Sequence, residues 1–510
     1  MTDTAKLVVC LLTSCSSLFL VHWRANRDIG AIAGAVPHAP KASPVVRWGV
    51  IVLAGLAITS FFLFLTARPG LSLVLCLALY FLLYVVNLAK IQILHEPLVL
   101  ADIWLLRQVF LYPGMYFPFL PVKTLLAVCG IVVSGIVLLF LLEPPLSRTQ
   151  QRLIHCGVVV FLIAPVALLF AMRHGWLSNL ARLLLAHFPP SHCATAGAVH
   201  NGTLPSTFIH PIWAGVLETT GNTPFSVNED SRPPLSRWPD RFEEMFVSVS
   251  RQKKEKQPHV IMVQAESFCD VREKFQGKQQ QELASFLPHW DALCAKGQTL
   301  PTPEGAFGAY TMRTEFSVLT GLSQKALGPW AFNPFLAAQK KKMWSLARHF
   351  SQVGYETIFI HPYHKDFFRR DRVMANLGFQ QFWDIEACKE LERFGPHVSD
   401  IAVAEHLNCY LAHSSSPVFA FFVTIEAHSP WPNDRLTDKE ITTCLHDIDV
   451  SLFNRQMQIY LCHLRNMDNT LGLLQNSISL PATESNVEQI QVWAYGDHEP
   501  SIDFSACSWK

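Results

Sequence analysis

The chain has 510 residues, half of them hydrophobic, and its formal net charge is +1. This length fits two to four domains. The balance of 41 basic against 40 acidic residues argues against a nucleic-acid-binding protein, because such proteins usually carry an excess of basic residues on one face. We therefore expect no nucleic-acid partner.

The hydrophobic residues concentrate in the first third of the chain, where they predict membrane-spanning helices. Four uncharged runs there are each about 20 residues long, which is enough to cross a hydrocarbon core as a helix. They are residues 48–67, 71–89, 124–142 and 153–172. So many runs in so short a stretch are hard to place as buried helices of a soluble domain. A shorter run, 7–21, predicts a fifth span; the alternative, a cleaved signal peptide, lacks a small-residue cleavage site. Residues 1–175 are therefore a predicted transmembrane domain.

Three segments outside these runs, up to residue 258, have a different character. Residues 90–123 contain several prolines, which predict a surface-lying or re-entrant piece rather than another spanning helix. Residues 176–188 have the amphipathic pattern of a helix that lies on a membrane surface. Residues 189–258 are rich in Pro, Ser, Thr and Asn, which predicts an extended connector with short ordered pieces. We therefore expect a linker over residues 176–258.

From residue 259 onward, buried strands alternate with helices. Continuous apolar runs predict strands over 259–267, 355–363, 418–428 and 490–498. Helical patterns lie between them, at 341–354 and 449–475. This alternation predicts an α/β domain, residues 259–510, with a mostly parallel central sheet that is covered on both faces.

The four predicted strands end in residues with chemically active side chains. These are Glu266, His361, Glu426 with His428, and Asp497 with His498. In an open parallel sheet, ligands bind at the carboxyl ends of the strands. We therefore expect these four segments to converge on one site.

The side chains of Glu266, Asp497 and His498 offer two carboxylates and an imidazole, which suit a divalent cation such as Mn²⁺, Zn²⁺ or Mg²⁺. Adjacent residues on a regular strand point to opposite faces, so Asp497 and His498 could not both ligate from one. At a strand end, Gly496 allows the chain to turn and bring them together. An ordinary surface loop is the alternative for an isolated Asp-His pair.

The stretch GAFGAYTMRTEFSVLTG, residues 305–321, supplies a candidate nucleophile. Its pattern becomes helical from about Thr314, which places Thr311 at or just before a helix N-terminus, where backbone N–H groups favour anions. A metal-bound threonine at such a position can lose its proton and attack phosphorus. The alternative is an ordinary cap or loop residue.

Two further stretches offer contacts for a phosphate group. HPYHKDFFRRD, residues 361–371, is basic and carries Arg370, a candidate clamp on one phosphate. His428 follows a predicted buried strand, where it could donate a proton to a leaving oxygen or a hydrogen bond to phosphate. A structural histidine is the alternative at that position.

Together these motifs resemble those of the lipoteichoic acid synthase family, within the alkaline phosphatase/sulfatase superfamily. The matching stretches are QAESF (264–268), YTMRTEF (310–316), HPYHKDFFRRD (361–371), TIEAHSPW (424–431) and YGDH (495–498). The resemblance implies an α-helical membrane domain of about five spans, followed by an α/β catalytic domain of the alkaline phosphatase/sulfatase type.

The resemblance implies a metal site and a nucleophile. Glu266, Asp497 and His498 correspond to metal ligands of the family, and Thr311 corresponds to both the nucleophile and a fourth ligand. The implied cofactor is one divalent ion, typically Mn²⁺ in family members, with Mg²⁺ or Zn²⁺ as alternatives.

The resemblance also implies contacts with the substrate. Arg370 and His428 correspond to phosphate and head-group contacts, and His361 corresponds to the histidine that opens its motif. Phe368 stands where the Gram-positive enzymes carry a tryptophan in the glycerol pocket, so this sequence departs from the family pattern there.

The implied reaction moves a phosphoglycerol group from phosphatidylglycerol to a cell-envelope glycan or polyol through a phosphothreonine intermediate. No CxPxR motif, typical of sulfatases, surrounds Thr311, and no cysteines flank it as in phosphoethanolamine transferases. The alternatives are a phosphoethanolamine transferase using phosphatidylethanolamine, a phosphodiesterase or sulfatase-like hydrolase, and a non-catalytic membrane scaffold or sensor. The presence of all four candidate ligands argues against the scaffold.

The family layout predicts a multi-pass protein of the bacterial inner membrane, with the catalytic domain facing the periplasm or the outside. The distribution of positive charge points the other way, because Arg24, Arg27, Lys41 and Arg47 would then lie outside. We prefer the family layout, because a lipid-derived donor and a cell-envelope acceptor need an outward-facing site.

Overall fold

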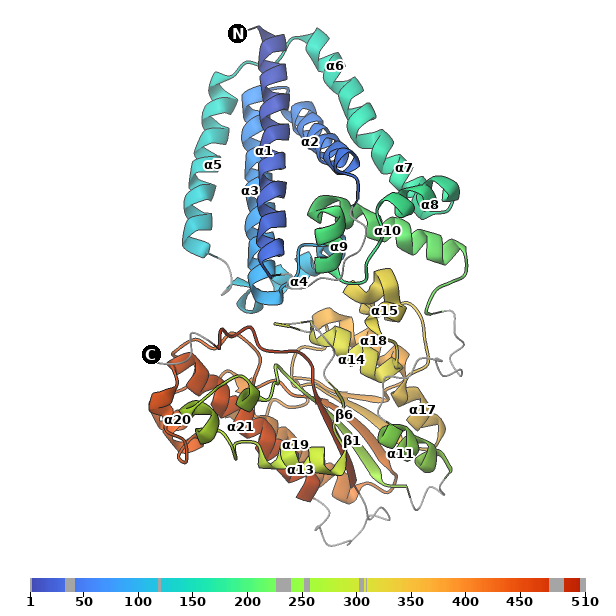
Figure 1. Cartoon of the computed structure of the whole chain (residues 1–510), viewed down its shortest axis with the longest axis vertical. Helices are drawn as coiled ribbons and strands as arrows, with labels where there is room; N and C mark the ends of the chain where they lie inside the picture. The colour runs from blue at the N-terminus through green and yellow to red at the C-terminus, as the bar shows by residue number, and fades with distance from the viewer. Residues whose placement is uncertain are drawn as a thin grey trace. The chain divides into compact units, whose positions relative to one another are not determined.

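A computed structural model describes residues 2–32, 42–117, 121–225, 240–251, 257–301, 307–308, 310–476 and 490–504 (Figure 1). The chain divides into two compact units. Unit 1 consists of Met1–Ser226 with Leu327–Phe332, and unit 2 consists of Val227–Ala326 with Asn333–Lys510. Each unit is described by itself.

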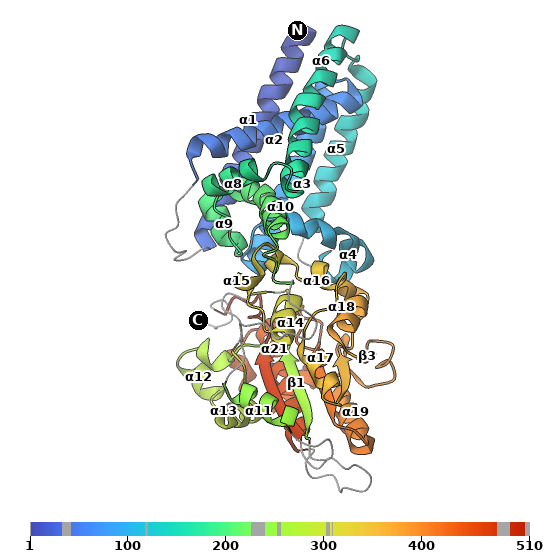
Figure 2. The same ribbon diagram turned by 90° about the vertical axis from the view of Figure 1, so that its right-hand side faces the viewer.

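Unit 1 contains five helices that are long and apolar enough to cross a membrane, as the sequence predicts. They are α1 (Asp3–Ile32), α2 (Pro44–Thr66), α3 (Pro69–Leu94), α5 (Val122–Leu142), and α6 (Arg148–Val158), which continues through the π-helical turn η4 (Val159–Ile163) into α7 (Ala164–Arg173). The first three pack against one another, α5 packs on α3, and α6 packs on α2 (Figure 1 and Figure 2). The predicted span over residues 7–21 is therefore part of a full-length helix.

Several polar groups inside this unit are paired. The carboxylate of Glu143 accepts hydrogen bonds from the N–H groups of Gly70 (2.8 Å) and Leu71 (3.0 Å), which lie in the first turn of α3. The hydroxyl of Ser14 lies 2.9 Å from that of Tyr80, and Thr59 donates to Ser14 at 2.7 Å. Such pairing is required where backbone and side-chain polar groups are shielded from water.

The segment between α3 and α5 is broken into short pieces, as its prolines predict. They are η1 (Leu100–Leu105), α4 (Leu106–Leu111) and η2 (Pro113–Met115). A helix also forms in the predicted amphipathic segment, α8 (Ser178–His187). Its position on a membrane surface stays a prediction.

The predicted extended connector is in part helical, which corrects the sequence reading. Residues 189–225 contain α9 (Ala194–Asn201) and α10 (Thr203–Thr219). The reason is an apolar stripe on α10: Ile209 packs with Phe188, and Ile212 packs with Met172 and Ala181. Burial of this stripe outweighs Pro211, which lies inside the helix. Further along, α11 (Asp240–Arg251) belongs to unit 2, and residues 226–239 and 252–256 of the predicted connector lie outside the described residues.

Unit 2 is built on a five-stranded sheet in the order β3-β2-β6-β1-β7, and every neighbouring pair is parallel. The strands are β1 (His259–Ala265), β2 (Glu356–Ile360), β3 (Gln381–Trp383), β6 (Val418–Val423) and β7 (Ile490–Gly496). The parallel sheet predicted from the sequence is confirmed, with β3 as an additional edge strand.

Helices cover both faces of the sheet (Figure 1). On β6, Ala420 and Phe422 pack into the core formed with α13 (Pro288–Lys296), α19 (Asp400–His413) and α21 (Arg455–Asn476). Phe419 faces the other way and stacks on Phe350 of α17 (Leu346–Gln352), with ring centroids 4.3 Å apart. All side chains of β1 and β6 are buried as a result, which explains why these strands read as continuous apolar runs.

Shorter elements complete unit 2. They are η6 (Val271–Glu273), α12 (Lys278–Glu282), α14 (Thr311–Thr320), α15 (Gln324–Leu327), α16 (Phe335–Ala338), η8 (Phe367–Arg369), α18 (Arg370–Leu377), the pair β4 (Arg393–Phe394) and β5 (His397–Val398), α20 (Asp438–Cys444) and η9 (Val450–Leu452). The helix η7 (Gly328–Phe332) belongs to unit 1.

Two predicted helices are shorter than expected, and each begins at a capping side chain. The hydroxyl of Ser345 accepts a hydrogen bond from the N–H of Arg348, so α17 starts at Leu346 rather than at residue 341. The side chain of Asn454 accepts from the N–H of Met457, so α21 starts at Arg455 rather than at residue 449.

Candidate functional site

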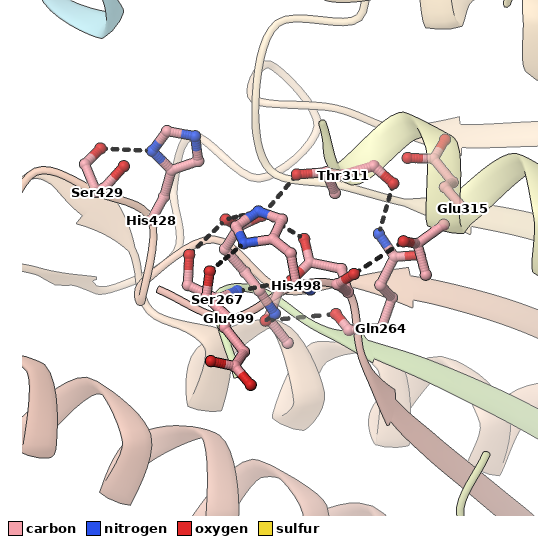
Figure 3. Close-up of polar contacts among 12 residues, drawn as sticks. Gln264, Ser267, Thr311, Glu315, His428, Ser429, His498 and Glu499 are labelled. Atoms are coloured by element: carbon pink, nitrogen blue, oxygen red, sulfur yellow. Dashed lines mark hydrogen bonds and ion pairs between the residues drawn. The ribbon is translucent and has the colours of Figure 1, made fainter. Parts of the chain in front are cut away.

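The ends of β1 and β7 bring Glu266, Asp497 and His498 together; of these three, His498 is labelled in Figure 3. The two strands are neighbours and their register pairs Ala265 with Gly496, so the residues that follow lie side by side. One ligand atom from each of the three buried side chains lies within 4.8 Å of the others. His498 Nε2 is 3.3 Å from Asp497 Oδ2 and 3.5 Å from Glu266 Oε1.

Backbone and hydroxyl groups orient the two carboxylates. Asp497 Oδ1 accepts hydrogen bonds from the N–H groups of Ser267 (2.8 Å) and His498 (2.7 Å), and Ser267 Oγ donates to Glu266 Oε1 at 2.9 Å. Ser267 has a φ of 52°, a left-handed conformation that turns the chain directly after Glu266. Asp497 Oδ2 and His498 Nε2, by contrast, are buried atoms without a hydrogen bond among the described residues. The donor chemistry of the cluster and these two atoms fit a divalent cation.

The pKa shifts of these three side chains also fit a bound divalent cation. Burial raises the pKa of Asp497 well above its usual value, and the charge of Glu266 adds to the shift. Burial also opposes ionisation of Glu266, but His428 and His498 outweigh it and hold the pKa of this carboxyl below its usual value. Burial lowers the pKa of His498, which favours the neutral ring that metal binding requires. A divalent cation would offset the electrostatic repulsion between the two adjacent carboxylates.

Thr311 is the first residue of α14, so the helix begins three residues earlier than the sequence predicts. Its hydroxyl donates a hydrogen bond to Glu266 Oε2 at 3.2 Å (Figure 3). The helix is tied to the sheet by Thr314, whose hydroxyl donates to the backbone carbonyl of Asp497 at 2.8 Å. Gln264 of β1 donates to the carbonyl of Thr311 at 3.5 Å. Thr311 therefore lies against the carboxylate cluster at a helix N-terminus, where an anion is stabilised.

Arg370 lies in a buried ion pair that the sequence analysis missed. The guanidinium bonds to Glu315 of α14, with Nη2 at 2.9 Å and Nε at 3.2 Å from Oε2. Burial raises the pKa of Glu315, and the positive charge of Arg370 opposes this shift. These bonds hold the start of α18 against α14, and they use Nε and Nη2 of the guanidinium. Arg370 therefore has a structural role in addition to being a candidate phosphate contact.

The remaining candidates lie around this arrangement. His361 follows β2, is buried, and its Nδ1 lies 3.2 Å from the carbonyl oxygen of Val423; burial and the charge of Arg370 lower its pKa well below the usual value. Phe368 is half-buried with a φ of 55°, and the Arg370 guanidinium lies 5.4 Å from its ring centroid. His428 is half-buried, and its Nδ1 donates to the carbonyl oxygen of Ser429 at 2.6 Å. Figure 3 shows His428 apart from the metal-ligand cluster, on a separate loop.

Glu426 does not join this site, although the sequence analysis placed it among the converging strand ends. Its carboxylate is fully buried and turns toward α19 and α21, where it accepts hydrogen bonds from the Asp400 N–H and the Asn466 amide. The expected convergence of the four strand ends is therefore wrong for this residue. Successive side chains alternate between the two faces of a strand, but this alternation ends where the chain turns after the last strand residue. It therefore cannot place the side chains that follow the strand.

A family model of sulfatases matches residues 258–504. This domain belongs to the sulfatase family. The match includes all five strands of the central sheet and every residue of the candidate site. The chain thus combines five apolar helices, those of a multi-pass membrane protein, with an enzyme domain of the alkaline phosphatase/sulfatase superfamily.

Known proteins resemble the chain over the sulfatase domain or over most of its length. The capsular polysaccharide biosynthesis protein RkpI of Rhizobium meliloti (strain 1021) is 26% identical over 502 residues, covering 97% of this chain and 85% of that protein. The Streptococcus pyogenes phosphoglycerol transferase GacH, solved with sn-glycerol-1-phosphate, is 20% identical with a TM-score of 0.37 and covers 52% of this chain and 68% of that one. The lipooligosaccharide phosphoethanolamine transferase A (EptA) of Neisseria meningitidis is 12% identical with a TM-score of 0.47 and covers 96% of this chain and 82% of that one.

Proposed function

We propose that the protein transfers a phosphoglycerol group from phosphatidylglycerol to a glycan or polyol of the cell envelope, with Thr311 as the nucleophile. The observation that carries the proposal is the hydrogen bond from the Thr311 hydroxyl to Glu266, at a helix N-terminus and beside Asp497 and His498. A nucleophile, an acceptor for its proton and a cation site are thus combined in one buried arrangement.

The proposed cofactor is a divalent ion, Mn²⁺ by resemblance, held by Glu266, Asp497, His498 and Thr311. When bound, it would act as a Lewis acid and favour the deprotonated form of the threonine hydroxyl. The structure supports this through the buried oxygen of Asp497 and nitrogen of His498 that lack hydrogen bonds.

In the first half-reaction, Thr311 Oγ forms a bond to the phosphorus of the donor lipid. The bond between that phosphorus and the diacylglycerol oxygen breaks, and His428 gives a proton to the departing oxygen. Glu266 Oε2, which already accepts a hydrogen bond from the threonine hydroxyl, receives its proton. Arg370, His361 and Phe368 are proposed to contact the phosphate and the head group.

In the second half-reaction, a hydroxyl of the acceptor attacks the phosphothreonine. The acceptor hydroxyl gives its proton to His428, which lost one in the first half-reaction. The bond between phosphorus and Thr311 Oγ breaks, and the threonine oxygen takes back the proton held by Glu266. The name of the capsular polysaccharide biosynthesis protein RkpI supports a cell-envelope polysaccharide as acceptor. We also propose that the sulfatase domain faces the outside of the bacterial inner membrane, where donor and acceptor meet.

Replacing Thr311 with alanine tests the proposal. Membranes carrying the full chain would be supplied with phosphatidylglycerol labelled in the head-group glycerol, and label in the glycan fraction would be measured. T311A should reduce transfer to the uncatalysed background, whereas T311S should keep part of it because a hydroxyl remains.

T320A is the matched control, since Thr320 lies on the same helix and its buried hydroxyl donates to the carbonyl of Phe316. It should transfer within about twofold of the wild type. Undiminished transfer by T311A would refute the mechanism. Transfer only from head-group-labelled phosphatidylethanolamine would keep the nucleophile and change the donor.

A further inference from the structure

The loop that carries His428 is held by a buried pair of carboxylates. Asp400, the first residue of α19, accepts hydrogen bonds from the N–H groups of Ile425 (2.9 Å) and Glu426 (3.1 Å). In return, Glu426 Oε1 accepts from the N–H of Asp400 at 2.7 Å. Both side chains are fully buried. This reciprocal arrangement fixes the first turn after β6 to the start of α19.

A second anchor joins Glu426 to the long helix α21. The other carboxylate oxygen, Oε2, accepts a hydrogen bond from the side-chain amide of Asn466 at 2.8 Å and lies 3.4 Å from His463 Nδ1. Glu426 therefore links three elements that are far apart in the sequence. Its carboxylate is satisfied by the scaffold and does not face the candidate active site.

The third anchor is Arg435, which binds the loop through its backbone. Nη1 donates to the carbonyl oxygens of His428 and Pro430, both at 2.6 Å, and Nη2 donates to that of Glu426 at 2.5 Å. One guanidinium thus satisfies three carbonyl groups within a stretch of five residues. The planar fork of arginine suits such a task, and a lysine could not bind all three in the same way.

The His428 side chain has little to hold it by itself. It is half-buried, and its one hydrogen bond among the described residues is to the carbonyl oxygen of the next residue, Ser429, which moves with it. The position of the imidazole therefore depends on the backbone of residues 425–430. Arg435 and the carboxylates of Asp400 and Glu426 hold that backbone in place.

We propose that Arg435 is a positioning residue for His428, and that the Asp400–Glu426 pair supports it by fixing the turn that leads into the loop. This inference rests on the proposed function, in which His428 protonates the departing oxygen. Proton transfer needs the two atoms within hydrogen-bond reach. A displacement of about 1 Å can cost roughly a hundredfold in rate.

A double-mutant cycle tests the inference with the full chain in native-like membranes and labelled phosphatidylglycerol. R435K keeps the charge but loses the fork, and should lower kcat roughly 10- to 100-fold with KM within about twofold. In an H428A background, R435K should cost less than about twofold more, because the residue that it positions is already gone.

Arg455, the first residue of α21, offers a matched control because it binds the same loop. It donates to the carbonyl oxygens of Asn433 (3.2 Å) and Leu436 (2.6 Å), which lie beyond His428. R455K should leave kcat within about twofold of the wild type in both backgrounds. Multiplicative losses for R435K and H428A, or an R435K enzyme of normal kcat, would overturn the inference.

Hydrogen–deuterium exchange gives a second readout that does not depend on activity. R435K should speed amide exchange in residues 425–431 and leave β1 and β7 unchanged. Faster exchange across the whole sheet would assign Arg435 a general structural role and overturn the inference. If H428A transfers normally, the use of His428 in the proposed function is refuted; exchange confined to 425–431 would then still establish Arg435 as the anchor of the loop.

Discussion

Replacing Glu315 with glutamine would test the buried ion pair behind the nucleophile helix. The side chains of Arg370 and Glu315 are 2% and 0% exposed, and Arg370 Nη2 lies 2.9 Å from Glu315 Oε2. Removing one charge of a buried pair costs about 3–5 kcal/mol, because the other charge is left uncompensated. Glutamine keeps one acceptor for Arg370, and burial already raises the pKa of Glu315, so we expect the low end of this range.

A loss of about 3 kcal/mol can be converted into a melting temperature. For domains of roughly 150–250 residues, 1 kcal/mol corresponds to about 2–4 °C. The sulfatase domain of E315Q should therefore melt about 6–12 °C below the wild type, measured by near-ultraviolet circular dichroism on the purified full chain. The double variant E315Q/R370M should melt above E315Q, because it removes the uncompensated guanidinium.

The partly exposed pair Arg465–Asp447 is the control, with a distance of 3.0 Å, an Arg465 side chain that is 15% exposed and an Asp447 side chain that is 50% exposed. Such surface pairs contribute at most about 1 kcal/mol, so D447N should melt within about 4 °C of the wild type. If E315Q melted as close to the wild type as D447N, or if the double variant melted below E315Q, the reasoning about the pair would be refuted.

Two further variants test the metal site and the acid response of the sulfatase domain. D497N should lower the metal content of the purified protein, read by elemental analysis, from about one ion per chain to a small fraction, because it removes one of two carboxylate ligands; D468N, which changes a buried carboxylate that caps α13, should keep the ion. H259N should reduce the loss of stability in acid. Burial lowers the pKa of His259 to about 4, against about 6.5 in the unfolded chain, so the unfolded chain binds the proton first as pH falls. The wild type should therefore lose about 3 kcal/mol more than H259N between pH 6.5 and pH 4 in urea unfolding; equal losses would contradict this.

Local sequence patterns predict much of this fold. The five spans follow from the length of uncharged runs, and the four main strands follow from continuous apolar stretches. The neighbourhood of Glu266, Asp497 and His498 follows from the rule that parallel strands end at one edge. These features depend on residues close together in the chain, so the sequence contains the information directly.

The features that the sequence analysis missed depend on contacts between distant segments. Glu315 and Arg370 are separated by 55 residues, and Glu426 meets Asp400 at a separation of 26. No periodicity links such positions, and an arginine in a basic stretch reads as a solvent-facing or ligand-facing residue. The helix α10 was missed for a related reason: its prolines and polar residues read as a connector, whereas burial of Ile209 and Ile212 decides its structure.

Thr311 is proposed to carry the transferred group, and mass spectrometry of the peptide that contains Thr311 shows whether it does. The full wild-type chain would be purified and given phosphatidylglycerol without an acceptor glycan, so that the second half-reaction cannot proceed, and its metal content would be measured in the same sample. We expect a glycerophosphoryl adduct on Thr311 in metal-loaded protein. A metal-loaded sample in which the glycerophosphoryl group is attached to another residue would contradict it.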